Sequence, residues 1–323
     1  MDAPADRSLA DLERVLDRTA AALQAHGAAT ETMEVLFREL FATRRQVPAD
    51  IWGEVVVGAC RRHPLAGLLH QDPFTFRAFR KPRGYAGDAV LLDFMYAAED
   101  ALMPPEWEAG TTLGKQICHY TSTCSQGTRA ARSRRRVIID ILNRRAAGTP
   151  GLSVLSLACG HLREARYCPA LRQGRLGRFL AVDQDRESLA VVSRELGPWG
   201  VVPLAASVRE VLRGEVVLSG FDLVYATGLY DYLADPVARR LCERLLSMLA
   251  PGGRFLVANV MPTCTSAAYM EAYMDWWLLY RTEAQLLRLA ETLPDEDVET
   301  VRVFTDELGQ VAFLEVEKAA TGR

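Results

Sequence analysis

The sequence has no long apolar run and no grouping of metal ligands. No apolar run approaches the roughly 20 residues that a membrane-spanning helix requires, so we expect no membrane partner. No two of the seven cysteines form a C-x-x-C pair, and the five histidines show no spacing typical of zinc ligands. These absences exclude a membrane-spanning protein, a dithiol redox protein and a zinc enzyme, and we expect no metal.

A basic excess is also missing. The chain has 38 basic and 41 acidic residues and a net charge of −3, whereas nucleic-acid-binding proteins usually carry a clear basic excess. We therefore expect no nucleic-acid partner. Only Lys81, Lys115 and Lys318 are lysines, which leaves 35 arginines. This bias reflects either a GC-rich genome or arginines that hold a carboxylate or a phosphate with their planar fork.

The remaining composition is typical of a globular protein, with 323 residues of which 49% are hydrophobic and 24% charged. At roughly 150 residues per domain, this length suggests about two domains. The N-terminal pattern is acidic and helical and differs from that of a signal peptide, and the cysteine count is odd. We expect reduced thiols and a cytoplasmic protein.

Two kinds of patterning divide the chain. Residues 1–147 read as helices, including 89–100 and 112–147, and predict an N-terminal α-helical cap or substrate domain. From Gly151 onward, short β-rich runs alternate with helices, as in a parallel, doubly wound sheet, and two final runs predict an antiparallel strand at its end. The predicted fold class is therefore α/β, and residues 148–323 form a Rossmann-like, mostly parallel sheet.

The strongest motif is VLSLACGHLREA at 154–165, where a strand ends in a tight turn that we expect to open a helix. Glycine in such a turn lets the backbone approach a ligand, and free amides at a helix start favour polar or anionic groups. A second strand, RFLAVDQD at 178–185, ends in Asp183, 23 residues after Gly160. A carboxylate at about this spacing binds a ribose diol in dinucleotide-binding proteins. The alternative is a generic strand–turn–helix unit with an acidic helix cap.

Two downstream motifs follow in order. FDLVYATGLYDYL (221–233) is a fourth strand with small and aromatic residues after it, and LLSMLAPGGRFLVANV (245–260) is a helix, a Pro-Gly-Gly turn and a fifth strand. With the two motifs above, they resemble the class I S-adenosylmethionine-dependent methyltransferases over roughly residues 150–320.

Flanking segments extend this resemblance to most of the chain. They are similar to segments of a bacterial group connected with 3-hydroxypalmitic acid methyl ester biosynthesis. These segments are GYAGDAVLLDFMY (84–96), GLYDYLADPVARRL (228–241) and YMDWWLLYRTEAQL (273–286). What the resemblance implies about the substrate is an expectation, because sites are grafted onto folds.

The resemblance implies S-adenosyl-L-methionine as the cofactor. Gly160 would lie against its methionine part, Asp183 would bind its ribose, and Ser207 would lie near its adenine. The turn departs from the usual G-x-G-x-G pattern, because Ala158 and Leu162 replace the outer glycines. The cofactor-binding residues that the resemblance implies are Ala158, Gly160, His161, Asp183, Ser207, Ala226 and Thr227.

At the reacting end, methyl transfer from a sulfonium needs positioning and exclusion of water. We expect Tyr85, Tyr230 and Asn259 to be catalytic, because tyrosine faces attract a sulfonium and an amide can orient a carboxylate or an amine. Each has a structural alternative, in core packing or in a turn. His161 would either contact the ligand or face solvent, and Asp88 would either cap the following helix or act as an acid–base group.

One segment, TRAARSRRRVIIDILNRR at 128–145, places seven arginines in a single predicted helix. Such a run is either a solvated helix face or an anchor for a carboxylate or a carrier phosphate. The pattern leaves both interpretations open.

Three functions fit these motifs. The first is methyl transfer from S-adenosylmethionine to a small carboxylate or amino-acid-derived metabolite, in secondary metabolism. The second is cyclisation of the cofactor, in which its α-amine attacks its own γ-carbon to give azetidine-2-carboxylate and methylthioadenosine; the altered turn at 158–162 favours this alternative. The third is a non-catalytic cofactor-binding protein. The expected partner is a small-molecule substrate, and the oligomeric state is left open.

Overall fold

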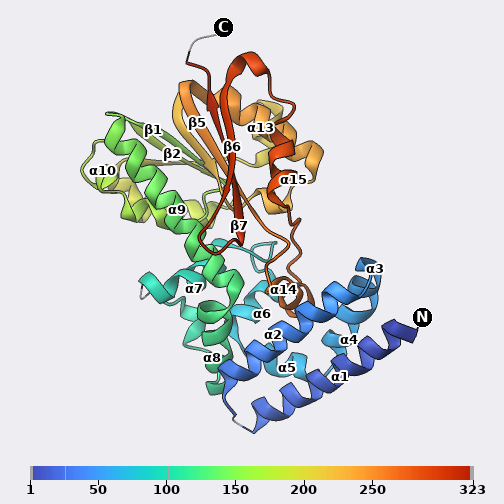
Figure 1. Cartoon of the computed structure of the whole chain (residues 1–323). Coiled ribbons are helices and arrows are strands. Elements are labelled where there is room, and N and C mark those ends of the chain that lie inside the picture. The colour runs from blue at the N-terminus through green and yellow to red at the C-terminus, as the bar shows by residue number, and fades with distance from the viewer. Residues whose placement is uncertain (1–2, 26, 101, 321–323) are drawn as a thin grey trace. The chain divides into compact units, whose positions relative to one another are not determined.

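The computed structural model describes residues 3–25, 27–100 and 102–320, and Figure 1 shows their helices and strands. The chain divides into two compact units. The helical unit comprises residues 1–132 and 264–277, and the sheet unit comprises residues 133–263 and 278–323. No helix among the described residues combines the length and the apolar character needed to cross a membrane.

The two units differ for two reasons from the predicted domains, which meet at a single boundary between residues 147 and 148. Helix α9 (Gln126–Gly148) begins in the helical unit and continues into the sheet unit. The segment 264–277, which follows the fifth strand, belongs with the N-terminal helices. Neither feature leaves a mark in local periodicity, because both depend on which surfaces a segment packs against.

The helical unit contains the helix predicted at 89–100, with the predicted bounds. The helix predicted at 112–147 is interrupted at Ser125, whose hydroxyl accepts a hydrogen bond from the amide of Thr128 (3.4 Å) and caps the second half. Its helices are α1 (Ala3–Gln24), α2 (Ala29–Gln46), α3 (Ala49–Ile51), α4 (Val57–Arg62), α5 (Leu65–Leu69), α6 (Pro73–Arg80), α7 (Ala89–Asp100), α8 (Thr112–His119) and α14 (Ala267–Tyr273), with π-helical turns at Trp52–Val56 and Tyr120–Cys124.

A buried carboxylate fixes α14 among the N-terminal helices. Glu271 is 1% exposed. Its oxygens accept hydrogen bonds from Nε and Nη2 of Arg44 (2.7 and 2.9 Å) and from Nε1 of Trp52 (2.7 Å). Arg61 donates to the backbone carbonyls of Glu271 and Ala272 (2.9 Å each). A buried charge is tolerated only when it is paired and hydrogen-bonded in this way, so these contacts specify where the segment packs.

The sheet unit confirms the predicted Rossmann-like α/β fold. Its seven strands run in the order β3-β2-β1-β4-β5-β7-β6, and β1 to β5 are parallel while β7 pairs antiparallel with both neighbours. The strands are β1 (Ser153–Leu157), β2 (Arg178–Asp183), β3 (Val201–Ala205), β4 (Phe221–Ala226), β5 (Leu249–Val260), β6 (Val298–Thr305) and β7 (Val311–Lys318).

Helices cover both faces of this sheet, with α13 and α15 on one face and α9 and α10 on the other (Figure 1). Helix α13 buries Leu241 and Leu245 against Phe255 of β5 and its neighbours. The α-helices are α10 (Pro169–Arg172), α11 (Arg186–Leu196), α12 (Val208–Arg213), α13 (Asp235–Met248) and α15 (Glu283–Leu287), besides α9. Short 3-10 turns lie at Arg163–Tyr167, Gly197–Trp199, Tyr230–Tyr232, Arg288–Ala290 and Asp295–Asp297.

The strand order contains one switch point, between β1 and β4. From β1 the chain moves outward to β2 and β3, and it then returns to place β4 on the other side of β1. In open α/β sheets, ligands bind outside the carboxyl ends of the strands at such a point. A ligand is therefore expected beside the residues that follow β1, β2 and β4.

Candidate functional site

The loop after β1 departs from a standard glycine turn in its residues, because two positions that are usually glycine carry side chains. Ala158, Gly160 and Leu162 all adopt left-handed conformations, with φ of 54°, 54° and 51°. Such a conformation costs a non-glycine residue about 1–2 kcal/mol, so the fold holds strained backbone at Ala158 and Leu162. The helix expected to open here is instead the 3-10 turn Arg163–Tyr167, because the left-handed Leu162 immediately precedes it and Pro169 starts α10 soon after.

Asp183, at the end of β2, joins this loop. Its Oδ2 accepts a hydrogen bond from the amide of Gly160 (2.8 Å), and its Oδ1 accepts one from the amide of Asp185 (2.9 Å). The side chain is buried, and that burial raises the pKa of Asp183 while the two amides oppose the rise. A carboxylate oxygen has two lone pairs, so each oxygen retains the capacity to accept from a ligand hydroxyl.

The alternative role, that of a helix cap, belongs to a different aspartate. Asp185 is the N-cap of α11 and accepts from the amide of Glu187 (3.0 Å) and the hydroxyl of Ser188 (2.6 Å). Asp183 is thus not needed to begin that helix. The spacing that singled out Gly160 and Asp183 in the sequence brings the two into direct contact.

Ser207 lies close to Asp183 along the adjoining strand. The amide of Ala206, just after β3, donates to the carbonyl of Asp183 (3.0 Å). Ser207 caps α12 in a reciprocal capping box, in which its amide and hydroxyl both lie 2.7 Å from Oε2 of Glu210. These bonds lower the pKa of Glu210. The contact of Ser207 with adenine remains a prediction.

Two further predicted cofactor residues end the central strand. Ala226 is the last residue of β4 and is fully buried, and Thr227 follows it and is half-buried. Tyr225 pairs with Ser156 of β1, so this end of β4 lies beside the loop at 158–162. The sheet therefore brings Ala226 and Thr227 to the switch point.

His161 is buried rather than solvent-facing. It is 6% exposed, and its Nδ1 lies 3.3 Å from Nη2 of Arg163. Arg163 in turn forms an ion pair with Glu195 of α11 (2.6 Å). The solvent-facing alternative for His161 is wrong, because the irregular loop turns the imidazole inward. Its contact with a ligand stays a prediction.

One partly buried pair near the switch point was missed from the sequence. The hydroxyl of Tyr225 donates to Oε1 of Glu164 (2.9 Å). Burial raises the pKa of Glu164, and the positive charges of Arg135 and Arg134 oppose that rise. No pattern could have identified the pair, because the direction of Glu164 depends on the irregular backbone that precedes it.

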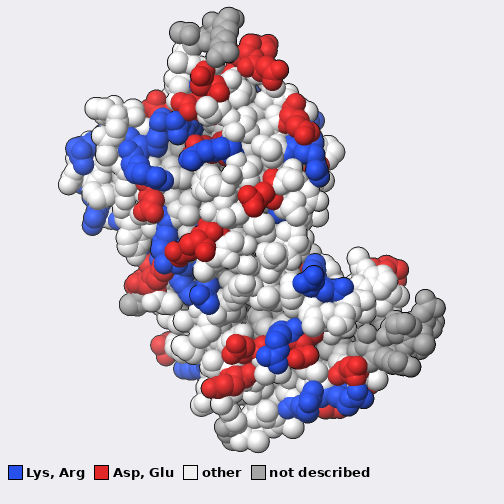
Figure 2. All heavy atoms as spheres, in the orientation of Figure 1, with Lys and Arg blue, Asp and Glu red and all other residues white. Residues whose placement is uncertain are grey.

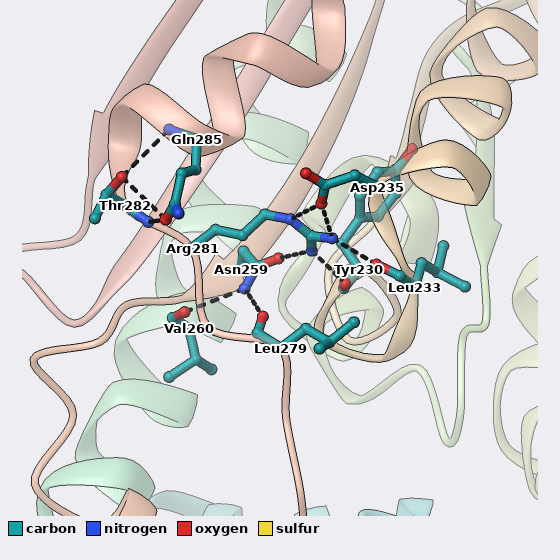
Figure 3. Close-up of polar contacts among 9 residues, drawn as sticks. All are labelled: Tyr230, Leu233, Asp235, Asn259, Val260, Leu279, Arg281, Thr282 and Gln285. Atoms are coloured by element: carbon teal, nitrogen blue, oxygen red, sulfur yellow. Dashed lines mark hydrogen bonds and ion pairs between the residues drawn. The ribbon is translucent and has the colours of Figure 1, made fainter. Parts of the chain in front are cut away.

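Asn259, predicted to be catalytic, uses all its polar atoms in structural contacts. Its Nδ2 donates to the carbonyls of Leu279 (2.7 Å) and Val260 (3.1 Å), and its Oδ1 accepts from Nη1 of Arg281 (2.7 Å), as Figure 3 shows. The side chain is fully buried. The amide therefore fastens the end of β5 to the segment before α15, and the structure gives it a positioning role.

Tyr230 packs in the core instead of lining an open surface. Its ring is fully buried among the side chains under α13, and its hydroxyl lies 3.4 Å from Sγ of Cys242. Burial raises the pKa of this phenol well above its ordinary value. The phenol is thus sequestered from any ligand, which argues against the catalytic role predicted for it; only its carbonyl takes part in the polar network of Figure 3.

Arg281 is the centre of that network. Its Nη1 donates to the carbonyl of Tyr230 (2.8 Å), and its Nη2 donates to the carbonyl of Leu233 (2.5 Å) and to Oδ1 of Asp235 (2.7 Å). The guanidinium is 4% exposed and joins the turn after β4 to Asn259 of β5 (Figure 3). A capping box between Thr282 and Gln285 then begins α15.

A second buried acid, Asp231, reinforces the same junction. Its Oδ1 accepts from the amide of Val260 (2.7 Å), and its carbonyl accepts from the amide of Leu279 (2.7 Å). Burial raises the pKa of Asp231 to about 6, against the opposing charges of Arg134 and Arg281. These bonds join the turn after β4 to the carboxyl end of β5 and to the segment that follows it.

Tyr85 belongs to the helical unit and is half-buried. Asp88, three residues on, accepts from the amide of Leu91 (2.8 Å) and from Nη2 of Arg77 (2.8 Å). Asp88 therefore caps α7 and neutralises Arg77, which decides between its two alternatives. The catalytic role of Tyr85 stays a prediction.

The distribution of surface charge agrees with the low net charge, and the side-chain groupings bear on metal binding. On the face drawn in Figure 2, basic and acidic side chains lie interspersed. Within the part of the chain that the structure describes, no group of three or more histidine, cysteine, aspartate or glutamate side chains is placed to hold a metal ion.

Comparisons with known proteins find similarity at the level of structure. No family model and no curated protein matches the sequence. A possible exported protein from Bordetella parapertussis aligns with 82% of this chain and 97% of its own, at 17% identity and a TM-score of 0.55. This likeness shows that the fold recurs in a solved structure.

Two methyltransferases align less closely. Magnesium protoporphyrin IX methyltransferase from Synechocystis, in a structure with bound S-adenosylhomocysteine, covers 60% of this chain and 88% of its own, at 12% identity and a TM-score of 0.45. An N-methyltransferase from Bradyrhizobium japonicum covers 58% and 97%, at 15% identity and a TM-score of 0.41.

Proposed function

We propose that this chain is an S-adenosylmethionine-dependent methyltransferase that acts on a small carboxylate or amino-acid-derived metabolite. The observation that supports this most is the contact between Gly160 and Asp183 at the carboxyl ends of β1 and β2 (2.8 Å). The contact places the carboxylate of Asp183, a hydrogen-bond acceptor, beside Gly160, where a ligand can come close to the backbone. Both residues lie next to the switch point. This is the arrangement that a ribose with an attached polar tail requires.

The side chains present suit that cofactor. Asp183 offers two oxygens to the two ribose hydroxyls, and the left-handed Gly160 has no side chain to block a ligand at the loop. Ser207 would lie near the adenine, and Ala226 and Thr227 present small side chains at the end of β4. His161, beside Gly160, completes the proposed set. When bound, the cofactor supplies an electrophilic methyl group on a sulfonium.

The chemistry on an acid substrate needs little from the protein beyond positioning. A carboxylate is already ionised at neutral pH, so its oxygen can attack the methyl group without a general base. The task of the chain is to hold the two reactants in line and to exclude water. The proposed catalytic set therefore leaves out Tyr230 and Asn259, whose side chains are engaged in buried contacts. It retains Tyr85.

One observation supports the cyclisation alternative. Ala158 and Leu162 place side chains in the loop after β1 where the standard glycine turn has none. A methionine tail on this loop would follow a different path, on which its α-amine could approach its own γ-carbon. The carbon–nitrogen bond forms as the carbon–sulfur bond breaks, methylthioadenosine leaves, and the amine proton passes to water.

Product analysis separates the candidate functions. The protein is incubated with S-adenosylmethionine carrying a labelled methyl group, with and without a panel of small carboxylic and amino acids. We expect S-adenosylhomocysteine and a labelled methyl ester or methylated product only when an acceptor is present. Methylthioadenosine in the absence of any acceptor supports cyclisation. Tight cofactor binding without either product indicates a non-catalytic protein, and no binding contradicts the proposal. A cytoplasmic location stays a prediction.

A further inference from the structure

Arg134 differs in its surroundings from three neighbouring arginines of the same run. Arg132 donates to the carbonyls of Met95 (2.9 Å) and Thr123 (2.6 Å) and is buried. Arg135 is 3% exposed, with its guanidinium 5.3 Å from the ring centre of Tyr167. Arg136 is exposed and pairs with Glu307 (3.2 Å). These three have structural or surface roles, so the run is neither a uniform solvated face nor a uniform anchor.

Arg134 is half-buried at the carboxyl end of β4. Its Nη2 and Nη1 lie 3.9 and 4.0 Å from the position that a Cβ would take at Gly228, two residues after the last residue of that strand. Gly228 is exposed and has no side chain. The guanidinium of Arg134 therefore lies beside solvent-exposed backbone at the end of the strand. In an open α/β sheet this is the edge at which ligands bind.

The charge of Arg134 acts on both sides of the switch point. The charge lowers the pKa of Glu164, which follows β1, and of Asp231, which follows β4, and so opposes the rise that burial causes in each. Both acids have closer engagements of their own, with the hydroxyl of Tyr225 (2.9 Å) and the amide of Val260 (2.7 Å). The guanidinium thus lies against Gly228 at the end of β4, and its charge also reaches the acid that follows β1, on the side where the polar tail of a ligand on the β1 loop would arrive.

An arginine at this place has a defined recognition chemistry. The guanidinium is always charged and presents a planar fork of N–H donors that matches a carboxylate. The proposed cofactor has one carboxylate, on the amino-acid tail that Gly160 would hold. The sulfonium is itself a cation, and the ribose hydroxyls carry no negative charge, so the carboxylate is the group that a guanidinium fits best.

We propose that Arg134 binds the α-carboxylate of S-adenosylmethionine at the switch point between β1 and β4. This rests on the proposed function. The residue would fix the amino-acid tail while Asp183 fixes the ribose, so that the sulfonium between them is held from both ends. A carboxylate of the acceptor is the other source of the same chemistry, and the experiment distinguishes the two.

The experiment compares two ligands that differ only in the carboxylate. S-adenosylmethionine and its decarboxylated analogue are each titrated calorimetrically into the wild-type protein, Arg134→Met and Arg136→Met. Methionine keeps the length of the side chain and removes the charged fork, and Arg136→Met is the matched control two residues away. Circular dichroism and thermal unfolding confirm that each variant is folded.

We expect the wild type and Arg136→Met to prefer S-adenosylmethionine by about tenfold or more, as a charge-assisted bidentate contact predicts. In Arg134→Met this preference should fall to about one, with affinity for the decarboxylated analogue unchanged. If Arg134→Met is not folded, Arg134→Lys serves instead, because it keeps the charge but loses the fork, and the preference should fall part of the way.

Two results would overturn the inference. The preference is unchanged in a folded Arg134 variant if the carboxylate bound is that of an acceptor or if Arg134 only neutralises Glu164 and Asp231. The two ligands weaken equally if the substitution merely disturbs the site. Absence of binding by the wild type is a separate result, and it contradicts the proposed function itself.

Discussion

At the scale of single residues, the junction of Figure 3 shows how structural and catalytic residues can be confused in a sequence. Asn259 stands at the end of β5, where ligands bind in such sheets, and asparagine is otherwise rare in this chain. Its partners Leu279 and Arg281 lie some twenty residues away, and that pairing has no local pattern. The place of Asn259 was predictable, and its contacts were not.

Arg281 is expected to contribute strongly to the stability of the sheet unit. Arg281→Met leaves two backbone carbonyls and Oδ1 of Asn259 without their donor, in a buried setting. We expect the free energy of unfolding to fall by about 3 kcal/mol or more. Denaturant unfolding measures this, and Arg288→Met, on an exposed position, is the control. Similar effects of the two substitutions would contradict the role given to Arg281.

Asp231 predicts a pH dependence of stability. Its pKa is about 6 in the folded state and 3.8 in the unfolded chain, so between these values the folded state holds a proton that the unfolded state has lost. Stability from this group is therefore fully present below about pH 4 and is lost as pH rises to about 6, by on the order of 2–3 kcal/mol.

Asp231→Asn removes this titration while keeping an oxygen for the amide of Val260. Relative to the wild type, we expect the variant to gain stability as pH rises from 4 to 7, since only the wild type ionises a buried acid. Urea unfolding at several pH values between 4 and 7 measures the difference. A difference that is constant over this range would show that Asp231 does not titrate there.

At the scale of elements, the regular parts were predictable and the irregular ones were not. Helix α7 and strand β2 have the bounds that periodicity gives. The loop after β1 does not follow its pattern, because its left-handed Ala158 and Leu162 are imposed by the surrounding contacts against local preference. Functional sites are where such disagreements between local preference and fold are expected.

This strain can be tested by substitution. Ala158 has a φ of 54°, a conformation that glycine adopts without steric cost. We expect Ala158→Gly to leave the free energy of unfolding unchanged or to raise it by up to about 1 kcal/mol. The control is Ala190→Gly, at an exposed position inside α11, which should cost about 1 kcal/mol. Equal losses from both would mean that Ala158 is not strained in solution.

At the scale of the whole molecule, the class of fold followed from the sequence, but the path of the chain did not. Alternating strands and helices after residue 150 predict the parallel sheet, and the hairpin at its end predicts the antiparallel β7. The return of 264–277 to the N-terminal helices was missed. It depends on buried contacts of Glu271 with Arg44 and Trp52, more than two hundred residues away.

The most direct test of the central claim is the binding of S-adenosylhomocysteine at the ends of β1 and β2. S-adenosylhomocysteine is titrated calorimetrically into the wild type, Asp183→Asn and Asp222→Asn. Asp222 is the matched control, because its Oδ2 also accepts from a backbone amide, that of Ser153 (2.8 Å). This contact lies at the amino-terminal ends of β1 and β4, away from the carboxyl ends where Asp183 lies.

We predict that the wild type and Asp222→Asn bind alike and that Asp183→Asn binds at least about tenfold more weakly, because a neutral amide is a poorer acceptor for the ribose hydroxyls. Equal affinity of all three proteins, or no binding by the wild type, would contradict the account.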